Sequence, residues 1–97
     1  MASFKVFTKG ENQEKLVKTA AAAASDTCEK LGFRSEATVS PPRRGEQEGE
    51  TCWVVVLASR RWWACFLAAS TALGFWSEGA EIVRWDQVGT GKRSRET

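Results

Sequence analysis

Hydrophobic positions along the chain form runs whose spacing changes between strand-like and helix-like periods. The most apolar run covers residues 52–57 (CWVVVL) and lies between polar residues at 50–51 and 59–61. A short run with three valines and no polar alternation is typical of a strand covered on both faces. The pattern therefore predicts a central strand over residues 51–58.

The first third of the chain predicts a strand followed by a helix. Residues 3–8 alternate, with Phe4 and Val6 on one face and Lys5, Phe7 and Lys9 on the other, and Gly10 ends the strand. Residues 11–31 follow helical spacing, with an apolar stripe at Leu16, Val17, Ala20, Ala21, Ala24, Cys28 and Leu31.

Both ends of this helix have candidate capping residues. Thr8 with Glu11 offers a capping box, and Asn12 is a competing N-cap. Gly32 suits the left-handed position after the last turn, and Phe33 follows where a Schellman motif places an apolar contact.

The middle of the chain is polar. Residues 34–40 (RSEATVS) predict a short edge strand, which Pro41 and Pro42 end because proline cannot donate to a ladder. Residues 41–50 have no apolar side chain beyond the prolines and predict a mobile loop.

Residues 60–73 allow two interpretations. A helical stripe is formed by Trp62, Cys65, Phe66, Ala69 and Leu73, between a possible cap at Ser59 and a possible stop at Gly74. Alternation is also readable, and tryptophan favours strands, but the alanines of this segment do not, so we prefer the helix.

A turn over residues 74–79 and a last strand over residues 80–86 follow. In that strand Glu81, Val83 and Trp85 are expected on the face opposite Ile82 and Arg84. Residues 89–97 predict a disordered basic tail.

The predicted order is β-α-β-β-α-β, a ferredoxin-like α+β sandwich in one domain over residues 1–88. In that topology the first and third strands are central and the second and fourth are edges, and here the third predicted strand is the most apolar and the second the most polar. The alternative is a cystatin-like fold, one helix on a five-stranded antiparallel meander, if residues 60–70 form a strand. The ferredoxin-like fold is a superfold that hosts many unrelated functions.

Composition and charge narrow the setting. The net charge of +2 resides in residues 92–97, so the remaining chain is neutral and lacks the broad basic field typical of nucleic-acid binding. Three cysteines without a CxxC pair predict buried free thiols in a reducing cytoplasm. We expect no signal peptide and no membrane segment, because no apolar stretch is long enough.

The residues favour no enzyme chemistry. The sequence contains no histidine, which removes the commonest general base and the commonest metal ligand, and a cysteine nucleophile would have no imidazole beside it. Residues 89–92 (GTGK) lack the spacing of a phosphate-binding loop. We therefore expect a protein without catalytic residues, cofactor or metal.

Protein interaction is the favoured function. Five tryptophans are hard to bury in 97 residues, and tryptophan and arginine are enriched at interfaces. Trp62 and Trp63 diverge by about 100° on a helix, which predicts that one of them faces solvent. The candidate partner-binding residues are Arg60, Arg61, Trp62, Trp63, Trp76 and Trp85. We expect a homodimeric regulator, or an inhibitor of a larger protein, as in phage proteins that block host defences.

Binding of RNA or single-stranded nucleic acid is the alternative. An open ferredoxin-like sheet can stack bases on aromatic side chains and hold phosphates with basic ones. The candidate residues are Lys5, Phe7, Lys9, Arg43, Arg44, Lys92 and Arg93, with Trp53 as a further platform.

Overall fold

The computed structural model describes residues 2–76 and 79–88, which form two helices and five strands. In chain order these are β1 (Ala2–Lys9), α1 (Gln13–Leu31), β2 (Ala37–Val39), β3 (Arg43–Arg44), β4 (Thr51–Leu57), α2 (Arg60–Trp76) and β5 (Glu81–Val88).

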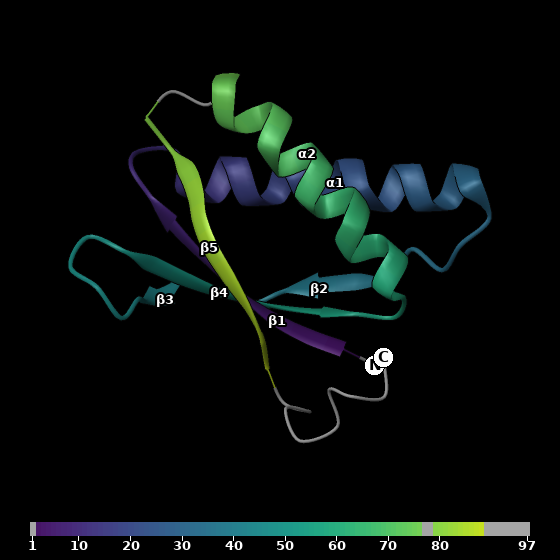
Figure 1. The fold of residues 1–97 in the computed structure, drawn as a ribbon, viewed down its shortest axis with the longest axis horizontal. Coiled ribbons are helices and arrows are strands. Elements are labelled where there is room, and N and C mark those ends of the chain that lie inside the picture. The colour runs from purple at the N-terminus through teal and green to yellow at the C-terminus, as the bar shows by residue number, and fades with distance from the viewer. Residues whose placement is uncertain (1, 77–78, 89–97) are drawn as a thin grey trace.

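The strands form one antiparallel sheet in the order β2-β4-β1-β5, and the two-residue β3 also pairs with β4. Both helices cover the same face of this sheet (Figure 1). The strands β1 and β4 are therefore central, β2 and β5 are edges, and the ferredoxin-like prediction is confirmed. The cystatin-like alternative is wrong, because residues 60–76 form a helix.

The core lies between the sheet and the helices. Phe4 and Val6 of β1 face the helices, opposite Val55 and Trp53 of β4, and all four are buried. The Trp53 indole N–H donates a hydrogen bond to Thr8 Oγ1 at 3.0 Å, which satisfies a polar group that burial would otherwise leave costly. The other face of β4 has no helix, and Val54 and Val56 are only half-buried there, so the expected coverage of β4 on both faces is wrong.

Helix α1 confirms its predicted end at Gly32 and, of the two predicted starts, the one at Asn12. Gly32 has φ +85°, and the Gly32 and Phe33 N–H groups donate to carbonyls of the last turn, as a Schellman motif requires. At the start Asn12 is the N-cap residue, in the left-handed region and without a side-chain capping bond. Thr8 cannot cap the helix because it is buried beneath Trp53 and donates to Gln13 Oε1 at 2.9 Å.

Two other boundaries differ from prediction. Residues 41–50 are not all loop, since Arg43 and Arg44 pair with Cys52 and Thr51 and form a hairpin with β4. Helix α2 begins after Ser59, whose Oγ accepts from the Arg61 N–H, but it continues through Gly74 to Trp76. The predicted tail, residues 89–97, lies outside the described residues.

A β-bulge interrupts the expected alternation of β5. The pairing with β1 shifts between Phe7 and Thr8, so that Arg84 lies opposite Phe7 while Ile82 lies opposite Thr8. The extra residue, Val83, breaks the period. Ile82 and Trp85 therefore share the helix-covered face, and Arg84 lies on the open face, contrary to the predicted grouping.

Candidate functional site

The most exposed apolar part of the sheet is its β5 edge. Val83 and Trp85 are 38% and 42% exposed, which sets them apart from the buried side chains of β1 and β4. Beside them runs an open groove of about 630 Å³ between β5 and helix α2. Its lining residues are Leu67, Ser70, Thr71, Glu81, Ile82, Val83, Arg84 and Trp85.

Trp85 packs against core aromatic rings although it is 42% exposed. Its ring meets the Trp63 ring edge-on at a centroid distance of 5.2 Å and the Phe4 ring at 5.7 Å. Phe4 and Trp63 are themselves stacked at 4.1 Å. The inner side of the indole is therefore fixed by the core, while its outer side forms part of the groove.

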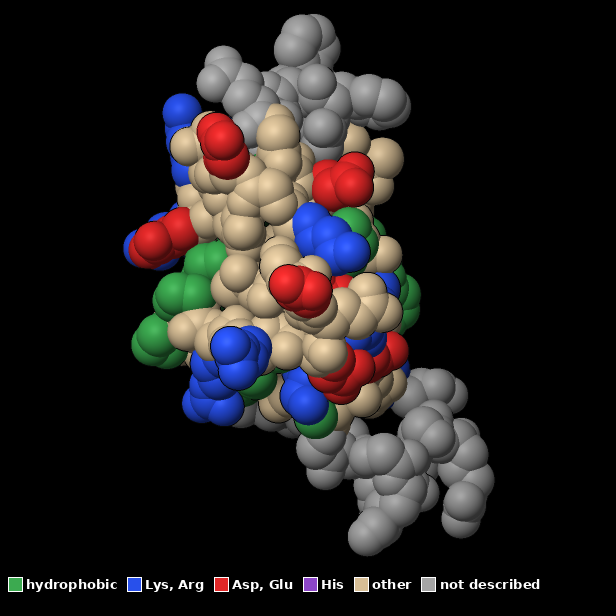
Figure 2. Space-filling model, turned by 90° about the vertical axis from the view of Figure 1, so that its left-hand side faces the viewer, with side chains coloured by type: hydrophobic (Ala, Val, Ile, Leu, Met, Phe, Trp, Pro, Cys, Tyr) green, Lys and Arg blue, Asp and Glu red, His purple; other side chains and the backbone are tan. Residues whose placement is uncertain are grey.

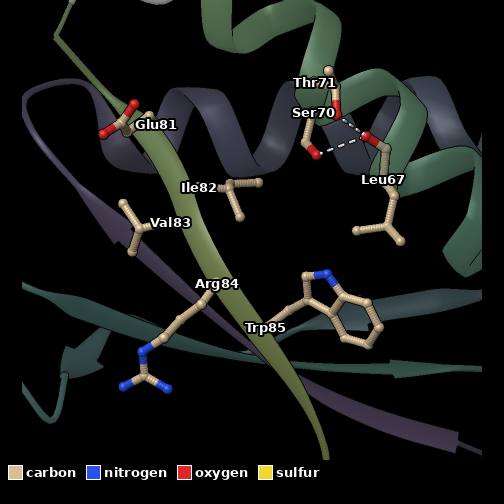
Figure 3. A pocket seen from close by; sticks show the side chains of 8 residues that line it. All are labelled: Leu67, Ser70, Thr71, Glu81, Ile82, Val83, Arg84 and Trp85. Atoms are coloured by element: carbon tan, nitrogen blue, oxygen red, sulfur yellow. Dashed lines mark hydrogen bonds between the residues drawn. The ribbon is translucent and has the colours of Figure 1, made fainter.

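The α2 wall of the groove offers few free polar groups. Figure 3 shows Ser70 and Thr71 turned back onto their own helix, where both hydroxyls donate to the Leu67 carbonyl oxygen at 3.0 and 2.9 Å. Ile82 and Trp85 point toward this wall, and Arg84 points away from it (Figure 3). The groove is thus bounded on its α2 side by Leu67 and the two internally bonded hydroxyl residues, and on its β5 side by the side chains of Ile82 and Trp85.

On the open face of the sheet, Arg84 joins β5 to the hairpin before β4. Its guanidinium lies over the Phe7 ring, 3.6 Å from the centroid. It also binds Glu46 at 2.8 Å, Glu50 at 3.3 Å and Asp86 at 3.2 Å. Burial alone would raise the pKa of the Glu50 carboxyl, but hydrogen bonds from the Gln47 N–H and from Arg84 outweigh it, so the pKa is lowered.

The predicted partner-binding residues are not one exposed cluster. Trp62 and Trp63 are 0% and 6% exposed, so the expectation that one of them faces solvent is wrong. Helix α2 packs against both α1 and the sheet, and each of the two rings contacts one of these neighbours. The Trp62 N–H donates to Ser25 Oγ of α1 at 2.9 Å, while Trp63 stacks on Phe4 of β1.

The other members of that set are scattered. Arg60 and Arg61 are exposed at the start of α2, and the Arg61 guanidinium lies over the Phe33 ring at 4.4 Å. The side chain of Trp76 lies outside the described residues. Trp85 alone of the described tryptophans is exposed, and the structure adds to it Val83 and the α2 wall, which sequence reasoning missed. The sequence did contain a signal for this site, namely a tryptophan on a strand that the expected topology places at an edge of the sheet.

Only part of the nucleic-acid candidate set lies together on the open face of the sheet, and no exposed aromatic ring of the described residues lies beside it there. Lys5, Phe7 and Lys9 lie on the open face of β1, and Arg43 and Arg44 are exposed on β3. Phe7 is only 1% exposed because Arg84 covers it, and Trp53 faces the helices. Neither ring is available for a base to stack on. Lys92 and Arg93 lie outside the described residues.

Other site types find little support in the part of the chain that the structure describes. No group of three or more potential metal-ligating side chains occurs among these residues. Within the same residues, neither helix is long and apolar enough to cross a membrane. The three cysteines are free, and burial raises the pKa of both Cys28 and Cys52.

Comparison with known proteins gives a fold and no family. No protein-family model and no curated protein matches the chain. Among solved structures, it is similar to the solution NMR structure of a de novo designed protein with a ferredoxin fold, LFR1 1. The TM-score is 0.50 at 14% identity, over 92% of this chain and 88% of the design. This likeness supports the ferredoxin-like architecture alone.

Proposed function

We propose that the protein is a small, non-enzymatic protein-interaction module that binds an extended segment of another protein along β5. The observation that carries this proposal is a half-exposed Trp85, packed on core aromatic rings, on an edge strand beside a groove. Strand addition to a sheet edge uses main-chain hydrogen bonds for affinity and side-chain pockets for specificity. Trp85 would supply the side-chain anchor, since pre-positioned tryptophans are common interface hot spots.

The opposite edge of the sheet is a poorer docking site. There β2 is three residues long, and Pro41 and Pro42 follow it closely. Short edges and prolines are devices that block further strand pairing. By contrast β5 is eight residues long and contains neither lysine nor proline, although it carries the bulge at Val83 and the charged residues Arg84 and Asp86. The β5 edge is therefore more accessible to an added strand than the β2 edge.

The exposed side of α2, beside the groove, is uncharged. Ala64, Ala68 and Ala72 are exposed along this helix, and no charged residue occurs between Trp62 and Trp76. The exposed side of α1 instead carries charged residues toward both of its ends: Glu14, Lys15, Lys18, Asp26, Glu29 and Lys30. Depletion of charge around aromatic anchors is the composition of interface centres.

The setting that we propose with this function is a reducing cytoplasm, which three free cysteines fit. The roles of homodimeric regulator and of inhibitor that covers a larger protein both use such an edge. Nucleic-acid binding on the open face is less well supported, because Phe7 is covered. On the side of the molecule that lies to the left in Figure 1, acidic and basic side chains are interspersed (Figure 2).

Selection from a phage-displayed random peptide library tests this proposal without a known partner. We expect wild-type protein, immobilised sparsely, to select peptides that bind along β5. Trp85→Ala should weaken their binding about 30-fold, which corresponds to the roughly 2 kcal/mol of a hot-spot residue.

Leu31→Ala is the matched control. Leu31 is 59% exposed at the end of α1, far along the chain from β5, so its loss should leave peptide binding unchanged. Circular dichroism of each variant shows whether the fold is retained. Peptides that bind Trp85→Ala as tightly as wild type, or no selected peptides at all, would contradict the proposal.

A further inference from the structure

The charges along β5 are arranged so that two copies of the strand, paired antiparallel, place opposite charges next to each other. When two copies of one strand pair antiparallel about a twofold axis, residues at equal distances from the axis lie opposite each other on the same face of the sheet. With the axis at Trp85, Arg84 of each copy lies opposite Asp86 of the other. Both side chains are on the open face, where they already bind each other within one chain at 3.2 Å.

Neighbouring positions of the axis lack this match. An axis at Arg84 sets two arginines opposite each other, and an axis at Asp86 sets two aspartates opposite each other. An axis at Val83 leaves Trp85 opposite Glu81. Because like charges directly opposite destabilise a strand pair and unlike charges stabilise it, the register centred on Trp85 is favoured.

The same register places apolar surface against apolar surface. Trp85 of each copy would lie opposite Trp85 of the other on the helix-covered side, beside the groove wall formed by Leu67. Directly opposite side chains have Cβ atoms about 5 Å apart, and aromatic pairs at this distance contribute favourably. The exposed half of each indole would thereby be covered.

We propose that the occupant of the β5 edge is a second copy of this chain, paired through β5 with the twofold axis at Trp85. This inference rests on the proposed function, because it names the partner of the same edge. The two sheets then continue as one, with the helices of both copies on one side.

Charge exchange tests the register. Wild-type protein should sediment at micromolar concentration as a dimer of the 10.7 kDa chain. Arg84→Asp and Asp86→Arg should each raise the dimer dissociation constant about tenfold or more, since each sets like charges opposite in two places. An equimolar mixture of the two variants should restore dimers, because the two aspartates of one variant then lie opposite the two arginines of the other.

Asp86→Asn is the control that removes charge without adding repulsion, and it should weaken the dimer less than Asp86→Arg. A monomeric wild-type protein, or a mixture that dimerises no better than its separate variants, would overturn the inference.

Arg84→Asp removes the guanidinium from Phe7 and could unfold the chain, so a second measurement is needed. Trp85→Cys should form a disulfide-linked dimer in glutathione disulfide much faster than Leu31→Cys, because only position 85 faces its own copy. Equal rates for the two variants would overturn the proposed register.

Failure here is distinguishable from failure of the proposed function. If the wild-type protein is monomeric but selects peptides that need Trp85, the edge binds other proteins and only the self-pairing is wrong. If it neither dimerises nor selects peptides, both are wrong.

Discussion

Single residues decide where this fold exposes aromatic surface. The sequence predicted that five tryptophans are hard to bury, and Trp85, one of the predicted partner-binding residues, is exposed, but the tryptophan expected to face solvent at position 62 or 63 is buried. Helical geometry alone separates Trp62 from Trp63 by about 100°, and only the packing of α2 against both α1 and the sheet shows that each direction meets buried neighbours. Exposure at Trp85 follows from its edge position.

Glu50 shows the same limit for charged residues. It ends a segment that the sequence predicted to be a mobile loop, yet it is 5% exposed and bound to Arg84, 34 residues away in the chain. Its lowered pKa means that folding favours the ionised carboxylate. Glu50 therefore contributes to stability above its ordinary pKa of about 4.5, and this contribution is lost as the pH falls through the lower folded-state value.

Glu50→Gln should consequently flatten the acid side of the stability profile. Between about pH 6 and about pH 3 the melting temperature of wild type should fall more steeply than that of the variant, which has no carboxylate to protonate. Differential scanning calorimetry measures both curves. Glu48→Gln, an exposed position in the same hairpin, should follow wild type. Parallel curves for wild type and Glu50→Gln would show that the Arg84 contact does not favour the ionised form.

At the scale of elements, most of the fold could be predicted from the sequence. Apolar periodicity indicated both helices and the four main strands, and polarity alone separated the central from the edge strands. The two-residue β3 and the bulge at Val83 were missed, since each depends on a partner strand. The bulge matters for the site because it brings Ile82 and Trp85 to the same side of β5.

The joint between β1, α1 and β5 depends on a close backbone approach. Gly10 has φ +103°, and a Cβ atom there would lie 1.3 Å from the Gly79 carbonyl oxygen. Gly10→Ala should therefore lower the free energy of unfolding by about 3 kcal/mol or more, from strain and overlap together. Urea denaturation measures the change.

Gly49→Ala is the matched control for Gly10→Ala. Gly49 also has a positive φ, +81°, but no heavy atom lies within 4 Å of its added Cβ. It should cost only the strain of a left-handed residue, about 1–2 kcal/mol. Equal costs at the two glycines would mean that the loop before β5 moves aside and does not fix the joint.

At the scale of the whole molecule, charge and fold bear on the class of partner. The ferredoxin-like fold is shared by proteins of unrelated function, and the similar structure is a design, so neither indicates a partner. The class of partner therefore has to be inferred from the exposed side chains. The open sheet face presents Lys5 and Lys9 but no free aromatic ring among the described residues, whereas the β5 edge presents an exposed Trp85 beside the uncharged face of α2.

Salt dependence separates the two classes of partner. Nucleic-acid binding releases counterions, so the logarithm of affinity falls with the logarithm of salt concentration by about 0.7–0.9 per phosphate contact. A chain whose net charge of +2 resides in residues 92–97 should bind a selected peptide, or its second copy, with a slope much shallower than about −3, the value for roughly four phosphates. Fluorescence anisotropy with labelled peptide and labelled poly(U) measures both slopes.

Trp85→Ala should weaken peptide binding more than the double variant that combines Lys5→Ala and Lys9→Ala. Tight poly(U) binding with a slope steeper than about −3, lost in the lysine variant and retained in Trp85→Ala, would instead make the open face the working surface.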